Sequence, residues 1–168
     1  KIPWIDDAGT LVSDSRLIKT HLETRHSADF SGGYPARDLA LGLAVERMLE
    51  NHAYWFAVEN RWLEPDNFAR GPVRFFRGVP ALIRPVIIRS VLKNTRRDVK
   101  TQGHDRLSAE EKLLLLGQVL QAMADLLGDR PYLLGDRMSG VDATAYAFLA
   151  TLETPQFVSP YGDAIRNI

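Results

Sequence analysis

The sequence predicts an α/β segment followed by an all-helical domain. Two short runs rich in Ile, Trp, Thr and Val, at residues 1–5 and 10–12, flank a polar turn that contains Gly, a pattern typical of an antiparallel hairpin. A Ser/Gly-rich stretch at residues 27–34 marks a domain boundary. After it, apolar residues recur at three- and four-residue spacing, which indicates helices. We therefore expect domains at residues 1–30 and 35–168.

The composition is that of a globular protein with a sizeable core. Of 168 residues, 45% are hydrophobic and 25% are charged. Lys and Arg together number 21, as do Asp and Glu, so the net charge does not favour a nucleic-acid partner, and we expect none. The absence of cysteine excludes disulfides, cysteine-bound metals and a thiol nucleophile within these residues. We expect no metal, no transmembrane segment and a cytoplasmic location.

The first fifteen residues carry the polar groups that a ligand could use. Pro3 lies near the start of the first strand and cannot donate to a sheet ladder, so it belongs at an edge or in a special turn. There the backbone groups of its neighbours are free to pair with a ligand.

A helix start follows the hairpin. Residues 13–15, Ser-Asp-Ser, precede a periodic apolar run, so the unpaired N–H groups and the positive dipole end of a helix lie at this cluster. A ligand carboxylate could bind Ser15 and the helix N-terminus, while Asp14 could bind an ammonium group. A ligand with both charges, such as an amino acid, would satisfy both.

These motifs resemble the glutathione-binding half of the glutathione transferase superfamily. The segment Lys1-Ile2-Pro3 is followed, eleven positions after the proline, by Asp14-Ser15 at a helix start. In that family the residue before a cis-proline pairs its backbone with the cysteinyl part of glutathione, and an acidic-Ser pair binds the γ-glutamyl end. The resemblance implies a truncated thioredoxin-like N-terminal half, with glutathione-binding roles for Lys1, Ile2, Pro3, Asp14 and Ser15.

The resemblance also implies where catalytic chemistry belongs. The Ser, Tyr or Cys that activates glutathione in the family follows its first strand, and a two-stranded hairpin is only marginally stable alone. We therefore expect earlier strands and the catalytic residue upstream of Lys1. The final segment also ends within an amphipathic pattern, so we expect this sequence to be part of a longer protein.

A long helix is predicted from Pro35 to about Leu63. A polar-aromatic stripe on it consists of Arg47, Asn51, Tyr54 and Arg61. It could line a groove for a second substrate, with Arg47, Asn51 and Tyr54 as the contacts, or it could be a solvated face. A neighbouring stripe is mostly apolar and would face the core. That stripe contains Leu41, Val45, Met48, His52, Trp55, Glu59 and Trp62. Within it, His52 fits a core histidine better than a catalytic base.

Residues 70–106 are strongly basic, with ten Lys or Arg against two Asp. Within them, residues 80–92 predict a basic amphipathic helix. This surface could pair with the acidic remainder or another subunit, contact a membrane or nucleic acid, or attract an anionic ligand. Internal complementarity fits the zero net charge best. The lack of aromatic residues from Arg77 to Arg106 argues against stacking on single-stranded nucleic acid.

Two capping boxes begin later helices, one at Ser108–Glu111 and one at Ser139–Asp142. We expect Ser139 and Asp142 to be structural caps. The segment from Pro131 to Asp142 is similar to the Pro-x-Leu-x-Gly…Ser/Thr-x-x-Asp pattern of the core helix in the helical domain of glutathione transferases. With residues 48–55 and the basic segment, it looks closest to the branch that contains failed-axon-connections and metaxin-like proteins.

The resemblance implies a homodimer that binds glutathione as co-substrate between its two domains. Its glutathione would be conjugated to a small electrophile, or used to isomerise, cleave or reduce one. The alternative is a non-catalytic binding module that docks a partner through its basic helical segment. Both alternatives share the same fold.

Overall fold

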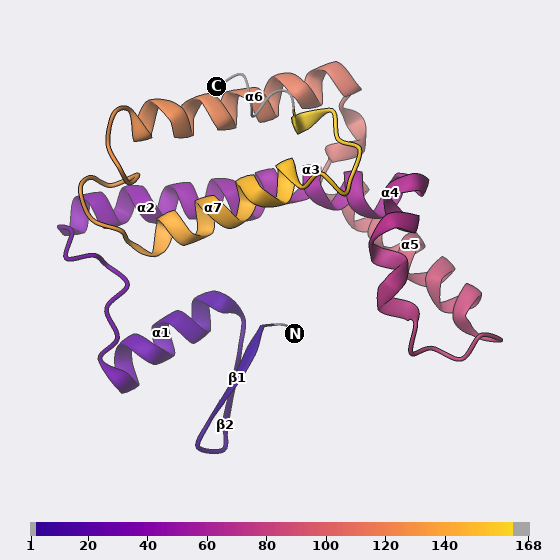
Figure 1. The fold of residues 1–168 in the computed structure, drawn as a ribbon, viewed down its shortest axis with the longest axis horizontal. Coiled ribbons are helices and arrows are strands. Elements are labelled where there is room, and N and C mark those ends of the chain that lie inside the picture. Colours follow the sequence, from indigo (N-terminus) through magenta and orange to yellow (C-terminus); the bar gives the residue numbers. More distant parts are fainter. Residues whose placement is uncertain (1–2, 163–168) are drawn as a thin grey trace.

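The computed structural model describes residues 3–162 (Figure 1). Strands β1 (Trp4–Asp7) and β2 (Thr10–Ser13) pair antiparallel, with Trp4 opposite Ser13 and Asp7 opposite Thr10. Ala8 and Gly9 both adopt positive φ, at 52° and 88°, as the tight turn of a two-residue hairpin requires. Helix α1 (Ser15–His26) follows directly. We refer to the hairpin and α1 together as the N-terminal unit.

The predicted long helix is present but is not a uniform α-helix. A π-helical turn, η1 (Leu49–Ala53), separates α2 (Ala36–Met48) from α3 (Tyr54–Val58), and a second, η2 (Glu59–Leu63), follows α3. A π-helical turn makes i→i+5 hydrogen bonds and so changes which residues share a face. The predicted core stripe is therefore partly wrong. Phe56 is buried, whereas Leu41 is 40% exposed.

The other helices surround and extend this long one. In Figure 1, α6 and α7 run beside it, and α4 and α5 form an arm at its far end. Their bounds, with those of the short 3-10 helices η3 and η4, are α4 Pro65–Arg70, η3 Pro72–Phe76, α5 Arg84–Thr101, η4 His104–Arg106, α6 Ala109–Leu127 and α7 Gly140–Glu153. Helix α5 covers only part of the predicted basic helix at residues 80–92, because the chain turns before Arg84 and Pro85 occupies its first turn.

The hydrophobic core lies within the helical part. Its buried residues come mainly from the long helix, α6 and α7, and include Leu49, Phe56, Leu116, Met123 and Ala145. Helix α1 contains no buried residue. Among residues 3–162, no helix has both the length and the apolar content needed to cross a bilayer.

The start of α7 is tied to the preceding loop through one carboxylate. Asp142 accepts hydrogen bonds from the Ser139 N–H at 2.8 Å and the Ser139 hydroxyl at 3.0 Å, while its other oxygen accepts from the Leu133 N–H at 2.8 Å. The start of α7 also contacts the Ser/Gly-rich stretch at residues 27–34, which we call the linker. The Gly140 N–H donates to the Phe30 carbonyl in this linker at 2.9 Å.

Candidate functional site

The fold brings the two predicted glutathione motifs together. The Asp14 N–H donates to the Pro3 carbonyl at 3.1 Å, so the start of β1 and the start of α1 lie side by side. This contact follows from the hairpin register, which places Trp4 opposite Ser13. Lys1 and Ile2 lie outside the described residues, so their predicted contacts with glutathione stay predictions.

Asp14 combines helix capping with an unusual backbone conformation. Its side chain accepts from the Arg16 N–H at 3.1 Å, which caps α1 as the Ser-Asp-Ser sequence predicted. Its φ is 88°, a value that residues other than Gly rarely adopt and that clusters at ligand sites. Ser15 is exposed at the first position of the helix.

An ionic seam joins α1 to the long helix. Arg16 Nε lies 3.3 Å from an Asp14 oxygen and 3.8 Å from a Glu50 oxygen, and Lys19 Nζ lies 4.0 Å from a Glu46 oxygen. Arg47 Nη1 lies 2.8 Å from the same carboxylate of Glu50. A cavity of about 160 Å³ opens between the two helices, and Lys19 and Glu46 line it. Charged side chains from both helices meet at this seam, and the lining of the cavity also includes apolar residues such as Phe30 and Leu39.

The predicted second-substrate residues have different surroundings. Arg47 is engaged with Glu50 at the seam, whereas Tyr54 lines a cavity of about 300 Å³ beside α7 with Arg61 and Trp62. Asn51 is exposed on the π-helical turn η1. Their grouping in one substrate groove stays a prediction.

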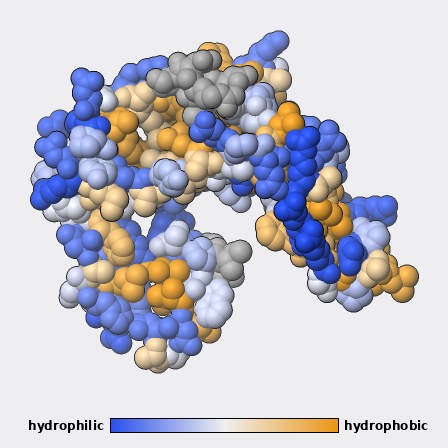
Figure 2. Space-filling view, viewed as in Figure 1, coloured by the Kyte–Doolittle hydropathy of each residue, from blue (hydrophilic) through white to orange (hydrophobic). Residues whose placement is uncertain are grey.

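One face of the molecule is concave. Figure 2 shows an open hollow between the N-terminal unit and the arm that contains α5. Both hydrophilic and hydrophobic surfaces border it, which suits a ligand with charged and apolar parts.

Sequence reasoning placed Glu59 on the core-facing stripe but missed the ion pairs that its half-buried side chain makes on η2. The carboxylate of Glu59 lies 2.7 Å from Lys112 Nζ and 3.1 Å from His104 Nε2. Burial raises the pKa of Glu59, whereas hydrogen bonds from His104 and Lys112 lower it. The hydrogen bonds have the larger effect, so the pKa of Glu59 lies below its ordinary value. These residues are 45 and 53 positions from Glu59 in the sequence, so no local pattern reveals them.

His52 has the surroundings of a packed histidine. Its ring lies edge-on to Phe56 with centroids 5.3 Å apart. Burial, followed by the charge of His104, lowers the pKa of His52, which favours the neutral ring.

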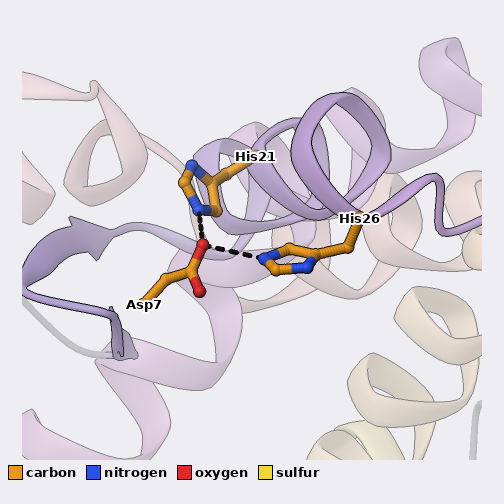
Figure 3. Close-up of side chains that lie close together, drawn as sticks. All are labelled: Asp7, His21 and His26. Carbon is orange, nitrogen blue, oxygen red and sulfur yellow. Dashed lines mark hydrogen bonds and ion pairs between the residues drawn. The ribbon is translucent and has the colours of Figure 1, made fainter.

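The described residues also contain a cluster that sequence reasoning did not single out (Figure 3). Asp7 Oδ2 lies 2.6 Å from His21 Nε2 and 2.8 Å from His26 Nε2. Hydrogen bonds from His26 and then His21 hold the pKa of Asp7 below its usual value. We call these three residues the histidine cluster.

Two family models match the chain. The glutathione S-transferase N-terminal domain matches residues 1–67, and the glutathione S-transferase C-terminal domain matches residues 116–168. Together they account for more than half of the sequence, at its two ends. The chain belongs to the glutathione S-transferase superfamily. The predicted fold class, a thioredoxin-like N-terminal portion followed by an all-helical domain, is therefore confirmed.

Two curated proteins are similar to this glutathione S-transferase family member over most of its length. The isoprene-epoxide–glutathione S-transferase of Rhodococcus sp. (strain AD45) is 27% identical over 152 residues, which are 89% of this chain and 64% of that protein. Failed axon connections of Drosophila melanogaster is 26% identical over 161 residues, which are 90% of this chain and 38% of that protein. The chain thus spans less than two thirds of either relative. No solved structure matches it significantly.

Proposed function

We propose that this chain forms part of a glutathione site at the seam between the N-terminal unit and the long helix, in a protein that transfers glutathione to a small electrophile. The contact between Asp14 and the Pro3 carbonyl carries the proposal, because it joins the two motifs that bind glutathione in this family. The positive φ of Asp14 supports it as well.

Each end of the ligand has a chemically matched group on this chain. The carboxylate of Asp14 attracts the ammonium group of the γ-glutamyl residue. The Ser15 hydroxyl and the N-terminus of α1 favour its carboxylate. Arg16 now lies beside Asp14, so its guanidinium would move toward Glu50 or the ligand carboxylate when the ammonium group arrives.

An epoxide is the first electrophile to test, because the Rhodococcus relative is named as an isoprene-epoxide–glutathione S-transferase. The glutathione thiolate would attack an epoxide carbon, the C–O bond would break, and the alkoxide would take a proton to give a hydroxythioether. Donors near the sulfur would stabilise the thiolate. We assign no described residue to that activation.

Calorimetry of the intact protein with glutathione tests the binding step. We expect the double change Asp14→Ala with Ser15→Ala to weaken binding by on the order of 2 kcal/mol or more, because charge-assisted contacts are lost. Asp14→Asn separates charge from capping, since Asn is also a good N-cap but cannot attract the ammonium group.

Ser108→Ala provides the matched control. It removes the N-cap of α6, where the Ser108 hydroxyl accepts from the Glu111 N–H at 3.2 Å, and so it costs helix stability without altering the seam. Its glutathione affinity should equal that of the wild type. If the wild-type protein binds no glutathione, the proposal is wrong.

The alternative is a binding module without transferase activity. The basic helix α5 favours it, because only Val99 is buried on that helix and the arm projects from the fold (Figure 1). Glutathione binding without loss of thiol in the presence of small epoxides or aryl halides would support this alternative. Steady thiol loss would support the enzyme, with a hydroxythioether as the product from an epoxide, or an aryl thioether and free halide as the products from an aryl halide.

The proposal extends to the assembly and the compartment. We infer a homodimer in the cytoplasm, as the family resemblance implies. Light scattering measures the molar mass and so tests the homodimer. Fractionation of cells tests the cytoplasmic location.

A further inference from the structure

We propose that the histidine cluster of Asp7, His21 and His26 binds a zinc ion, which would link the tip of the hairpin to the end of α1. Asp7 is the last residue of β1, and His26 is the last residue of α1. Figure 3 shows both imidazole rings directed at one carboxylate.

The spacing of the ligand atoms suits one small cation. The carboxylate oxygen and the two imidazole nitrogens all lie within 4.8 Å of one another. Bonds of about 2.0–2.2 Å in tetrahedral geometry hold ligand atoms roughly 3.3 Å apart. The two contacts of Asp7, now 2.6 and 2.8 Å, would therefore lengthen by roughly 0.5–0.7 Å around the ion. Side-chain rotation can supply such a change.

The donor set selects the class of metal. Two imidazole nitrogens and one carboxylate oxygen are ligands that Zn²⁺ commonly takes, whereas Mg²⁺ and Ca²⁺ prefer oxygen ligands alone. Binding requires neutral rings with their proton on Nδ1, so that each Nε2 lone pair points at the ion. In Zn²⁺ sites that have three protein ligands, a water molecule commonly completes the coordination.

The surroundings leave the cluster accessible to a cation. The side chain of His26 is 51% exposed, that of Asp7 is 26% exposed and that of His21 is 15% exposed. The half-exposed ring of His26 provides the entry path. Both His26 and the ion would lie at the carbonyl end of α1, where the helix dipole favours positive charge.

The location separates this site from the glutathione contacts. Asp14 caps the N-terminus of α1 at Ser15, whereas His26 ends the helix eleven residues after Ser15. At about 1.5 Å per residue, the two ends are roughly 17 Å apart. Zinc would thus have a structural role, by cross-linking β1 to α1 within a unit whose helix has no buried residue.

Titration of the intact, EDTA-treated protein with ZnCl₂ in a calorimeter tests the proposal. We expect saturable binding of one ion per chain. His26→Gln and Asp7→Asn should each lower the zinc affinity at least tenfold. Loss of a residue that merely orients a metal ligand already costs about tenfold or more in affinity, and loss of the ligand itself should cost at least as much. Cobalt(II) added in place of zinc should give visible d–d absorption with the wild type and not with His26→Gln.

His52→Gln is the matched control, since it removes a histidine outside the cluster. Its zinc affinity should equal that of the wild type, and circular dichroism of each metal-free variant would show that the fold is retained. The proposal fails if the wild type shows no saturable binding at zinc concentrations up to about 100 micromolar, because structural zinc sites bind far more tightly than that. It also fails if His26→Gln binds as tightly as the wild type, or if His52→Gln weakens binding equally.

Discussion

Glu59 makes the stability of the long helix sensitive to acid. Its carboxylate contacts Lys112 and His104, and its pKa lies below the ordinary value of 4.5 because these hydrogen bonds outweigh the effect of burial. A carboxylate with a lowered pKa stabilises the fold above its unfolded-state pKa, and this contribution is lost as the pH falls through the folded-state pKa.

We therefore expect the free energy of unfolding to fall below about pH 4.5, and the Glu59→Gln variant to lose less stability over that range. Urea unfolding at several pH values measures this effect. Glu110→Gln, at an exposed position on α6, is the control and should keep the acid dependence of the wild type. Equal acid dependence in Glu59→Gln and the wild type would contradict the assignment.

Individual site residues were predictable where the sequence pattern is local. The Asp14 cap follows from Ser-Asp-Ser before an apolar run, and its contact with Pro3 follows from hairpin register. The histidine cluster was missed because Asp7 and His21 are fourteen positions apart and meet only after the hairpin folds onto α1. No periodicity of a single element encodes that contact.

At the scale of elements, the start of α7 depends on one side chain. Asp142 accepts from two N–H groups and one hydroxyl, and Ser139 and Leu133 supply them. We expect Asp142→Ala to lower the free energy of unfolding by about 2–3 kcal/mol, because partly buried donors lose their acceptor. Denaturant unfolding measures this loss.

Glu111→Ala is the comparison, because it opens the capping box of α6 at an exposed position. It removes only the bond from the Ser108 N–H, which water can replace, and should cost about 1 kcal/mol or less. A loss for Asp142→Ala no larger than this would show that the buried bonds contribute little.

The elements themselves were largely predictable. Periodicity placed the long helix from Pro35 to about Leu63, and α2 through η2 cover residues 36–63. The π-helical turns were not predictable, because the sequence keeps the three- and four-residue spacing of an α-helix through them. Phe56, which lies between the two turns, is buried, whereas Leu41 in the preceding α2 is partly exposed.

At the scale of the whole molecule, Tyr34 connects the linker at residues 27–34 to the loop before α7 through hydrogen bonds. Its hydroxyl donates to the Arg137 carbonyl at 2.7 Å and accepts from the Arg137 N–H at 2.8 Å. The Arg137 guanidinium also lies 5.3 Å from the centre of the Tyr34 ring.

We expect Tyr34→Phe to lower the free energy of unfolding by about 1–2 kcal/mol and to speed amide hydrogen exchange in residues 28–34, because both hydroxyl bonds are lost. Mass spectrometry after exchange locates the effect. Tyr146→Phe is the control, since that side chain is 76% exposed. Unchanged exchange in the linker would show that other contacts hold it.

The seam between the N-terminal unit and the long helix has one more consequence. Its described ion pairs are long, at 3.8 Å for Arg16–Glu50 and 4.0 Å for Lys19–Glu46, and α1 contributes no buried side chain. Charge pairs of this kind weaken as ionic strength rises, whereas apolar contacts do not. Added salt should therefore weaken the contact between the N-terminal unit and the long helix before it weakens the helical core. A zwitterionic ligand bound at the seam would restore part of the electrostatic attraction that salt removes.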